Sequence, residues 1–127
     1  ILGLFKPSDH GSTYGGNPLG AAIAREAMAI LVEERLVERS LENGSYARER
    51  LAKIDHPAID HIRGKGLFIG IVLDRPARSF CLALQERGLL CKETHENVIR
   101  FAPPLTISRT DLEWAMEQFE AVFEGEG

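Results

Sequence analysis

Cysteine is scarce in this chain: only Cys81 and Cys91 occur among 127 residues. Their separation lacks the close pairing of a zinc or dithiol redox motif, so we expect two free, reduced thiols. Histidines are equally scattered, at His10, His56, His61 and His95. Metal binding would need these side chains to converge from distant parts of the chain, and no metal site is predicted.

Long apolar runs are also absent. No stretch approaches the roughly 20 apolar residues that a transmembrane helix needs, and the first residues lack the regions of a signal peptide. These features predict a cytoplasmic protein without a membrane partner. The formal net charge of −4 and the lack of a basic run with interleaved aromatics disfavour nucleic acid. The 44% hydrophobic and 27% charged content is typical of a modest globular protein with one core.

A glycine-rich loop precedes a strong helix start near the amino end, where residues 10–20 have the sequence HGSTYGGNPLG. Ser12 and Thr13 offer hydroxyl donors, and the glycines let a ligand approach the main chain closely. Asn17 and Pro18 suit the cap and the first turn of a helix. The loop could hold a phosphate, but the same composition is typical of any capped loop. It contains neither a nucleophile elbow nor a Walker lysine.

The expected elements are helical before Pro57 and mixed after it. Hydrophobic periodicity, caps and turn residues place them as follows: helices at 18–39 and 41–54, strands at 59–63 and 66–73, a helix at 77–87, strands at 89–92 and 98–102, and a last helix opened by a capping box of Ser108 and Asp111. Lys65, between Gly64 and Gly66, is assigned to a turn rather than to a site. This order predicts a small α/β (α+β) domain with helices on one face of a mainly antiparallel sheet.

Three blocks carry a family resemblance: HGSTYGGNPLG at 10–20, RGKGLFIGIVL at 63–73 and GLLCKETHENVIRFAPPLTIS at 88–108. On these blocks the chain resembles the carboxyl-terminal part of class III pyridoxal-phosphate (PLP) aminotransferases. The third block is most similar to the ornithine aminotransferase branch. The resemblance implies the small C-terminal domain of a fold-type I PLP transferase, with a large-domain segment and loop at 1–17, a long linking helix at 18–39, and the small domain at 40–127.

The resemblance also implies site residues. In the family this loop reaches the cofactor phosphate, which the other subunit of a dimer mainly holds; the match falls on Ser12 and Thr13, with Thr13 favoured. The arginine of the third block maps onto Arg100, which is expected to meet the α-carboxylate of an oxo acid or to pair with a glutamate elsewhere. A planar guanidinium matches a carboxylate in bidentate geometry. The apolar neighbours Ile99 and Phe101 indicate that Arg100 projects from a buried strand.

Other parts of the family's chemistry have no match in this chain. PLP chemistry needs a lysine that binds the cofactor and an acidic partner for its ring nitrogen, and in the family both lie upstream. None of the four lysines, Lys6, Lys53, Lys65 and Lys92, falls at that position. No catalytic residue is therefore assigned. The chain opens at Ile1, at a point that matches the middle of the large domain. We expect a fragment, a separately encoded half or a truncated product that is inactive alone.

The leading interpretation is the C-terminal portion of an enzyme that transfers the δ-amino group of ornithine to a 2-oxo acid, giving glutamate semialdehyde. Alternatives are another class III ω-aminotransferase, a non-catalytic folded remnant or interaction protein, and a stand-alone module that binds a phosphate ligand. An apolar face on the first helix, including Leu19, Ile23 and Ile30, predicts a homodimer or a complementary N-terminal chain.

Overall fold

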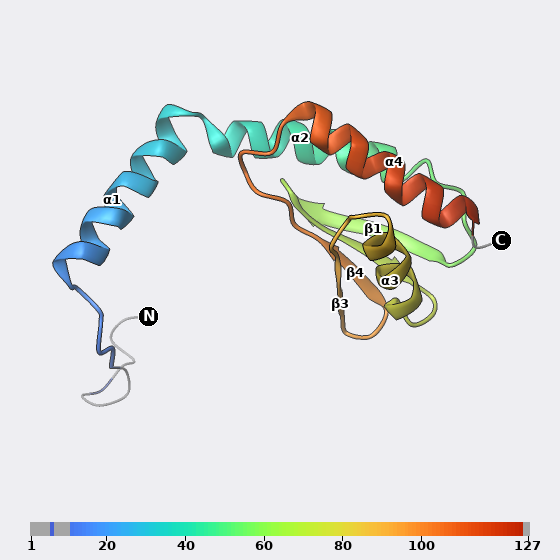
Figure 1. Ribbon diagram of the computed structural model, residues 1–127, viewed down its shortest axis with the longest axis horizontal. Helices are drawn as coiled ribbons and strands as arrows, with labels where there is room; N and C mark the ends of the chain where they lie inside the picture. The colour runs from blue at the N-terminus through green and yellow to red at the C-terminus, as the bar shows by residue number, and fades with distance from the viewer. Residues whose placement is uncertain (1–5, 7–10, 126–127) are drawn as a thin grey trace. The chain divides into compact units, whose positions relative to one another are not determined.

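The computed structural model describes residue 6 and residues 11–125, which form four helices and four strands (Figure 1). The elements are α1 (Pro18–Glu33), α2 (Leu36–Leu51), β1 (Ile59–Lys65), β2 (Phe68–Leu73), α3 (Arg78–Glu86), β3 (Lys92–Thr94), β4 (Val98–Phe101) and α4 (Arg109–Gly125). The chain divides into two compact units after Arg35. Within the large-domain segment and loop implied at 1–17, residues 1–5 and 7–10, His10 among them, lie outside the described residues.

The first unit contains the glycine-rich loop and α1. The side-chain oxygen of Asn17 accepts a hydrogen bond from the Gly20 amide at 2.8 Å, and Pro18 occupies the first turn. Both groups act as the sequence predicts: the cap satisfies an amide that has no partner within the helix, and proline has no amide to satisfy. No side chain of α1 is buried.

The prediction of a single helix at 18–39 is wrong, because α1 ends at Glu33 and α2 begins at Leu36. Arg35 adopts a left-handed conformation with φ of 50°, and its amide donates to the Val32 carbonyl at 3.1 Å in a tighter turn. Glycine and asparagine are the residues that usually adopt a left-handed conformation. An arginine at this position therefore does not indicate that the helix breaks. α2 consequently starts before the expected residue 41, and its first residue, Leu36, is buried.

The second unit is built on a four-stranded sheet in the order β1-β2-β4-β3, with every neighbouring pair antiparallel. Alternate residues of β2, Ile69, Ile71 and Leu73, are buried against the helices, as strand geometry requires. Strand β4 adds Ile99 and Phe101 to the core. Helices α2, α3 and α4 contribute further core residues, including Leu51, Phe80, Leu84, Leu112, Met116 and Phe119. The expected antiparallel sheet with helices on one face is confirmed (Figure 1).

The third strand lies later in the sequence than expected. The sequence predicts a strand at 89–92, whereas β3 spans Lys92–Thr94 and pairs with β4. Gly88 directly follows the helix expected at 77–87, and its left-handed conformation, with φ of 88°, caps α3. The Leu89 amide donates back to the Leu84 carbonyl at 2.9 Å. Because the helix end uses that amide, the chain from Leu89 to Cys91 forms a connection rather than a strand.

The turn between β1 and β2 docks onto α2. The Ser40 hydroxyl accepts from the Leu67 amide at 3.1 Å, and the Arg48 guanidinium donates to the Gly66 carbonyl at 3.0 Å. Gly44 packs directly against that same carbonyl, where an added Cβ would overlap it. The turn expected around Gly66 is confirmed by a φ of 54°. The absence of a side chain at Gly44 therefore lets α2 approach the turn closely.

The last helix begins at the predicted capping site. The Ser108 hydroxyl accepts from the Asp111 amide at 3.0 Å and donates to the Asp111 carboxylate at 2.7 Å. Aspartate is shorter than the usual glutamate, so its carboxylate meets the cap hydroxyl instead of the cap amide.

Candidate functional site

The glycine-rich loop is closed by its own side chains. The Ser12 hydroxyl oxygen accepts from the Gly15 amide at 2.8 Å, and the Asn17 side-chain amide donates to the Tyr14 carbonyl at 2.6 Å. The exposed Thr13 hydroxyl makes no hydrogen bond to any described residue. Ser12 thus shapes the turn.

The second predicted site residue, Arg100, lies on the sheet face opposite the helices. Its neighbours Val98, Ile99 and Phe101 are buried, whereas Arg100 itself is exposed. Arg100 makes no hydrogen bond or ion pair with the residues that the structure describes. Strand pairing on both sides holds its backbone, with Gly70 of β2 and Lys92 of β3 as partners.

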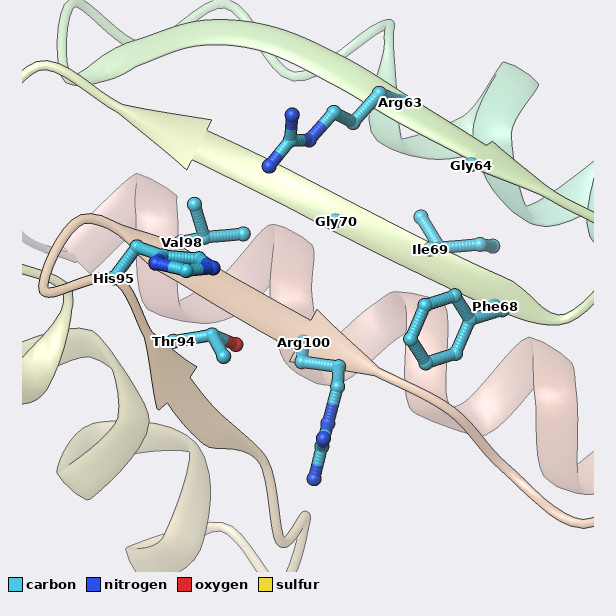
Figure 2. A pocket seen from close by; sticks show the side chains of 9 residues that line it. All are labelled: Arg63, Gly64, Phe68, Ile69, Gly70, Thr94, His95, Val98 and Arg100. Carbon is cyan, nitrogen blue, oxygen red and sulfur yellow. The ribbon is translucent and has the colours of Figure 1, made fainter. Parts of the chain in front are cut away.

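Arg100 helps to line a cavity of about 340 Å³ on this face. Figure 2 shows the lining side chains, which come from all four strands and from the turn after β3. In the sheet register Arg63 pairs with Gly70, and Gly70 pairs with Arg100. The structure therefore places two arginines on either side of one glycine.

Arg63 is a cavity residue that the sequence analysis missed. Its block, RGKG, was assigned to turn geometry, and the alternation of β1 alone does not show which strand lies beside it. The proximity of Arg63 to Arg100 becomes visible only once the strand order β1-β2-β4 is known, because this order brings together segments far apart in the sequence. His95 was considered only as a scattered metal ligand, yet it lines the same cavity from a turn in which its φ is 51°.

The cysteines are not placed for chemistry. Cys81 is buried and Cys91 is half-buried, and both are free. Burial raises the pKa of the Cys81 thiol to about 11 and that of the Cys91 thiol to about 12. Both are therefore protonated at neutral pH, and neither is an activated nucleophile. Within the described part of the chain, no cluster of potential metal ligands occurs and no helix is both long and apolar enough to span a membrane.

The antiparallel sheet with helices on one face matches the fold that the family resemblance implies, and the comparison with known families agrees. Residues 1–123 match the family described as aminotransferase class-III. The chain belongs to the class-III aminotransferases.

The curated relatives narrow the similarity to one branch. The chain is 59% identical over 118 residues to an ornithine aminotransferase of Halalkalibacterium halodurans, covering 93% of this chain and 30% of the relative. It is 56% identical over 124 residues to ornithine aminotransferase 2 of Staphylococcus saprophyticus, covering 98% of this chain and 31% of the relative. The chain therefore spans about a third of the length of these relatives.

Solved structures support the fold. An acetylornithine aminotransferase from Elizabethkingia anophelis superimposes with a TM-score of 0.87 at 39% identity, covering 98% of this chain and 34% of that one. An ornithine aminotransferase from Toxoplasma gondii gives a TM-score of 0.88 at 34% identity, with coverage of 98% and 31%. The expected fold class, part of a PLP-transferase fold, is confirmed.

Proposed function

We propose that this chain forms the C-terminal part of an ornithine aminotransferase, which transfers the δ-amino group of ornithine to a 2-oxo acid and gives glutamate semialdehyde. The observation that carries this proposal is the 59% identity to the Halalkalibacterium halodurans enzyme over 93% of the chain. The substrates are then a small amino acid and a small oxo acid, and the cytoplasm is the proposed location.

Different segments of the chain have different roles in the proposed enzyme. Residues 1–17 belong to the large domain and supply the loop, residues 18–39 link the domains, and residues 40–127 form the small domain that carries Arg100. PLP, when bound, supplies an electron sink for the reaction. The remainder of the family's fold, upstream of the matched stretch, supplies the cofactor lysine, so this chain is inactive without that part.

The loop fits the phosphate end of PLP. An exposed hydroxyl at Thr13, on a turn that Ser12 and Asn17 close, is a suitable hydrogen-bond donor to a phosphate oxygen. Such a donor does not have to give up an internal hydrogen bond when the ligand arrives. In the assembled enzyme Thr13 would hold the phosphate from one side, and Ser12 would keep the turn in shape.

A Thr13→Ala substitution tests this contact in a chimera in which our chain replaces the matching stretch of the Halalkalibacterium halodurans enzyme. We expect the Kd for PLP to rise by roughly tenfold, because one hydrogen bond to a charged group is lost. Equilibrium dialysis of the cofactor measures it. Thr13→Ser, which keeps the hydroxyl, should restore most of the affinity. A Kd that is the same in the alanine variant and the parent would contradict the assignment.

The exposed apolar side chains of α1 support assembly with further protein. Leu19 is 72% exposed, Ile23 62% and Val32 72%. A helix that buries none of its side chains gains little stability from packing, and clustered apolar exposure marks an interaction surface. We propose that the remainder of the fold, in a homodimer or from a complementary N-terminal chain, covers this helix.

Acetylornithine is the second candidate donor, because the Elizabethkingia anophelis structure is that of an acetylornithine aminotransferase. The higher identity to ornithine aminotransferases favours ornithine. The chimera decides between them when kcat/KM is measured for both donors with the same oxo acid. We expect ornithine to be the better donor by at least about tenfold. A preference for acetylornithine would overturn the proposed substrate and leave the family unchanged.

A further inference from the structure

Helix α1 gains no stability from tertiary packing. It has 16 residues, as α2 has, and α4 has 17. Among these helices of matched length, α4 buries seven residues and α2 four, whereas α1 buries none. Most helical stability in proteins comes from packing, and an isolated helix shorter than about 12–15 residues is marginal in water. α1 is barely longer than that limit.

The side chains of α1 replace little of the missing packing. Its first turn has no acidic residue and its last turn no basic residue, so the helix dipole has no favourable partner there. Arg25 and Glu26 form no ion pair with the residues that the structure describes, whereas Arg109 and Glu113 support α4 as an i,i+4 pair. The Asn17 cap is the exception, and it satisfies a single amide. Local interactions therefore stabilise α1 weakly.

Apolar side chains lie on opposite faces of α1. At about 100° per residue, Leu19, Ile23 and Ile30 share one face, and they are 72%, 62% and 38% exposed. Met28 and Val32 lie on the roughly opposite face, with exposures of 61% and 72%. A helix that is apolar on all sides is typical of a buried helix. The chain spans about a third of its relatives' length, so the covering protein is the family's remaining two thirds.

We propose that α1 folds on association: in the 127-residue chain alone its helix opens readily, and the protein that covers it makes the helix permanent. The inference rests on the proposed function, in which the remainder of an aminotransferase fold covers α1. Ordering α1 then uses part of the free energy of association, as in coupled folding and binding. Because Asn17 caps α1 at the Gly20 amide, the end of the glycine-rich loop becomes fixed together with the helix.

Hydrogen–deuterium exchange with mass spectrometry tests the proposal in the 127-residue chain and in the chimera. In the chain alone, amides of residues 18–33 should exchange within about tenfold of the rate of an unstructured peptide. Those of α2 and α4, the controls of matched length, should exchange at least about a thousandfold more slowly. In the chimera, exchange in α1 should slow by at least about a hundredfold, because opening must expose covered apolar surface. Equal protection of α1 and α4 in the chain alone, or an unprotected α1 in both proteins, would overturn the proposal.

Glycine substitutions give a second readout. Ala24→Gly lowers the helix propensity of α1, and it should leave the urea midpoint of the 127-residue chain unchanged, because α1 takes no part in the cooperative unfolding. The same substitution should lower the midpoint of the chimera. Ala121→Gly is the matched control in α4 and should lower both midpoints. A lowered midpoint for Ala24→Gly in the chain alone would contradict the proposal.

The exchange pattern does not depend on activity, so failure of this inference differs from failure of the proposed function. A chimera that uses ornithine, together with an α1 that is protected in the chain alone, would reject the folding of α1 on association and nothing else. An α1 that is ordered only in a chimera without ornithine activity would reject the ornithine assignment alone.

Discussion

Replacing Arg100 by glutamine in the chimera is expected to raise KM for the 2-oxo acid by roughly 10- to 100-fold. The substitution removes a bidentate, charge-assisted contact worth about 1.5–3 kcal/mol, and each 1.4 kcal/mol is a factor of ten in affinity. The backbone should be undisturbed, because Arg100 is exposed and its buried neighbours Ile99 and Phe101 hold the strand. Steady-state kinetics with the oxo acid varied at saturating ornithine measure the effect.

Two variants control this experiment. Arg100→Lys keeps the charge but loses the planar fork, so its KM should fall between those of the parent and the glutamine variant. Arg75→Gln removes an arginine that pairs with Asp74 at 2.7 Å on an exposed segment, and it should leave KM unchanged. If KM in the glutamine variant equals the parent value, Arg100 does not bind the oxo acid.

A Gly44→Ala substitution is expected to lower the free energy of unfolding by at least about 2 kcal/mol. The added Cβ would overlap the Gly66 carbonyl group, which is backbone and cannot rotate away as a side chain does. Relief requires α2 to move off the β1–β2 turn, which would strain the Ser40–Leu67 and Arg48–Gly66 hydrogen bonds. The roughly 1 kcal/mol gained from the higher helix propensity of alanine offsets only part of this cost.

Urea unfolding of the 127-residue chain, followed by circular dichroism, measures the change in midpoint. Gly125→Ala is the matched control: it also lies in a helix, but a Cβ there meets nothing within 4 Å. Its stability should stay within about 0.5 kcal/mol of the parent. Equal midpoints for Gly44→Ala and the parent would show that the turn does not pack closely against α2.

The sequence predicts those features that depend on neighbouring residues. Asn17 with Pro18, Ser108 with Asp111, and Gly88 each mark a helix end, since a cap needs only a side chain or a glycine a few residues from the helix. The strands at residues 59–73 follow from β-branched content and the glycines between them. These local signals are enough to place four helices and an antiparallel sheet in the right order.

Two element boundaries could not be predicted from the local sequence. The break at Arg35 has no glycine or proline to mark it, and the apolar periodicity continues across it. The shift of β3 from residue 89 to Lys92 arises because the end of α3 uses the Leu89 amide. In both places a hydrogen bond formed at a helix end decides the boundary, and hydrophobic pattern does not encode it.

Some residues of the candidate site could be predicted from the sequence and one could not. Thr13 and Arg100 come from the family resemblance, and their roles stay predictions. The structure adds that Ser12 closes the loop while Thr13 is free of hydrogen bonds to described residues. Arg63 could not be found from the sequence, because its proximity to Arg100 depends on the order β1-β2-β4 and on the register at Gly70.

Ornithine-dependent transamination is the most direct test of the account. The purified chain is assayed with PLP, ornithine and 2-oxoglutarate, first alone and then mixed with the N-terminal part of the Halalkalibacterium halodurans enzyme that precedes the matched stretch. We predict that the mixture forms glutamate and that neither part forms glutamate alone. Turnover by the isolated chain, or none in a mixture whose two parts are folded and associated, would contradict it.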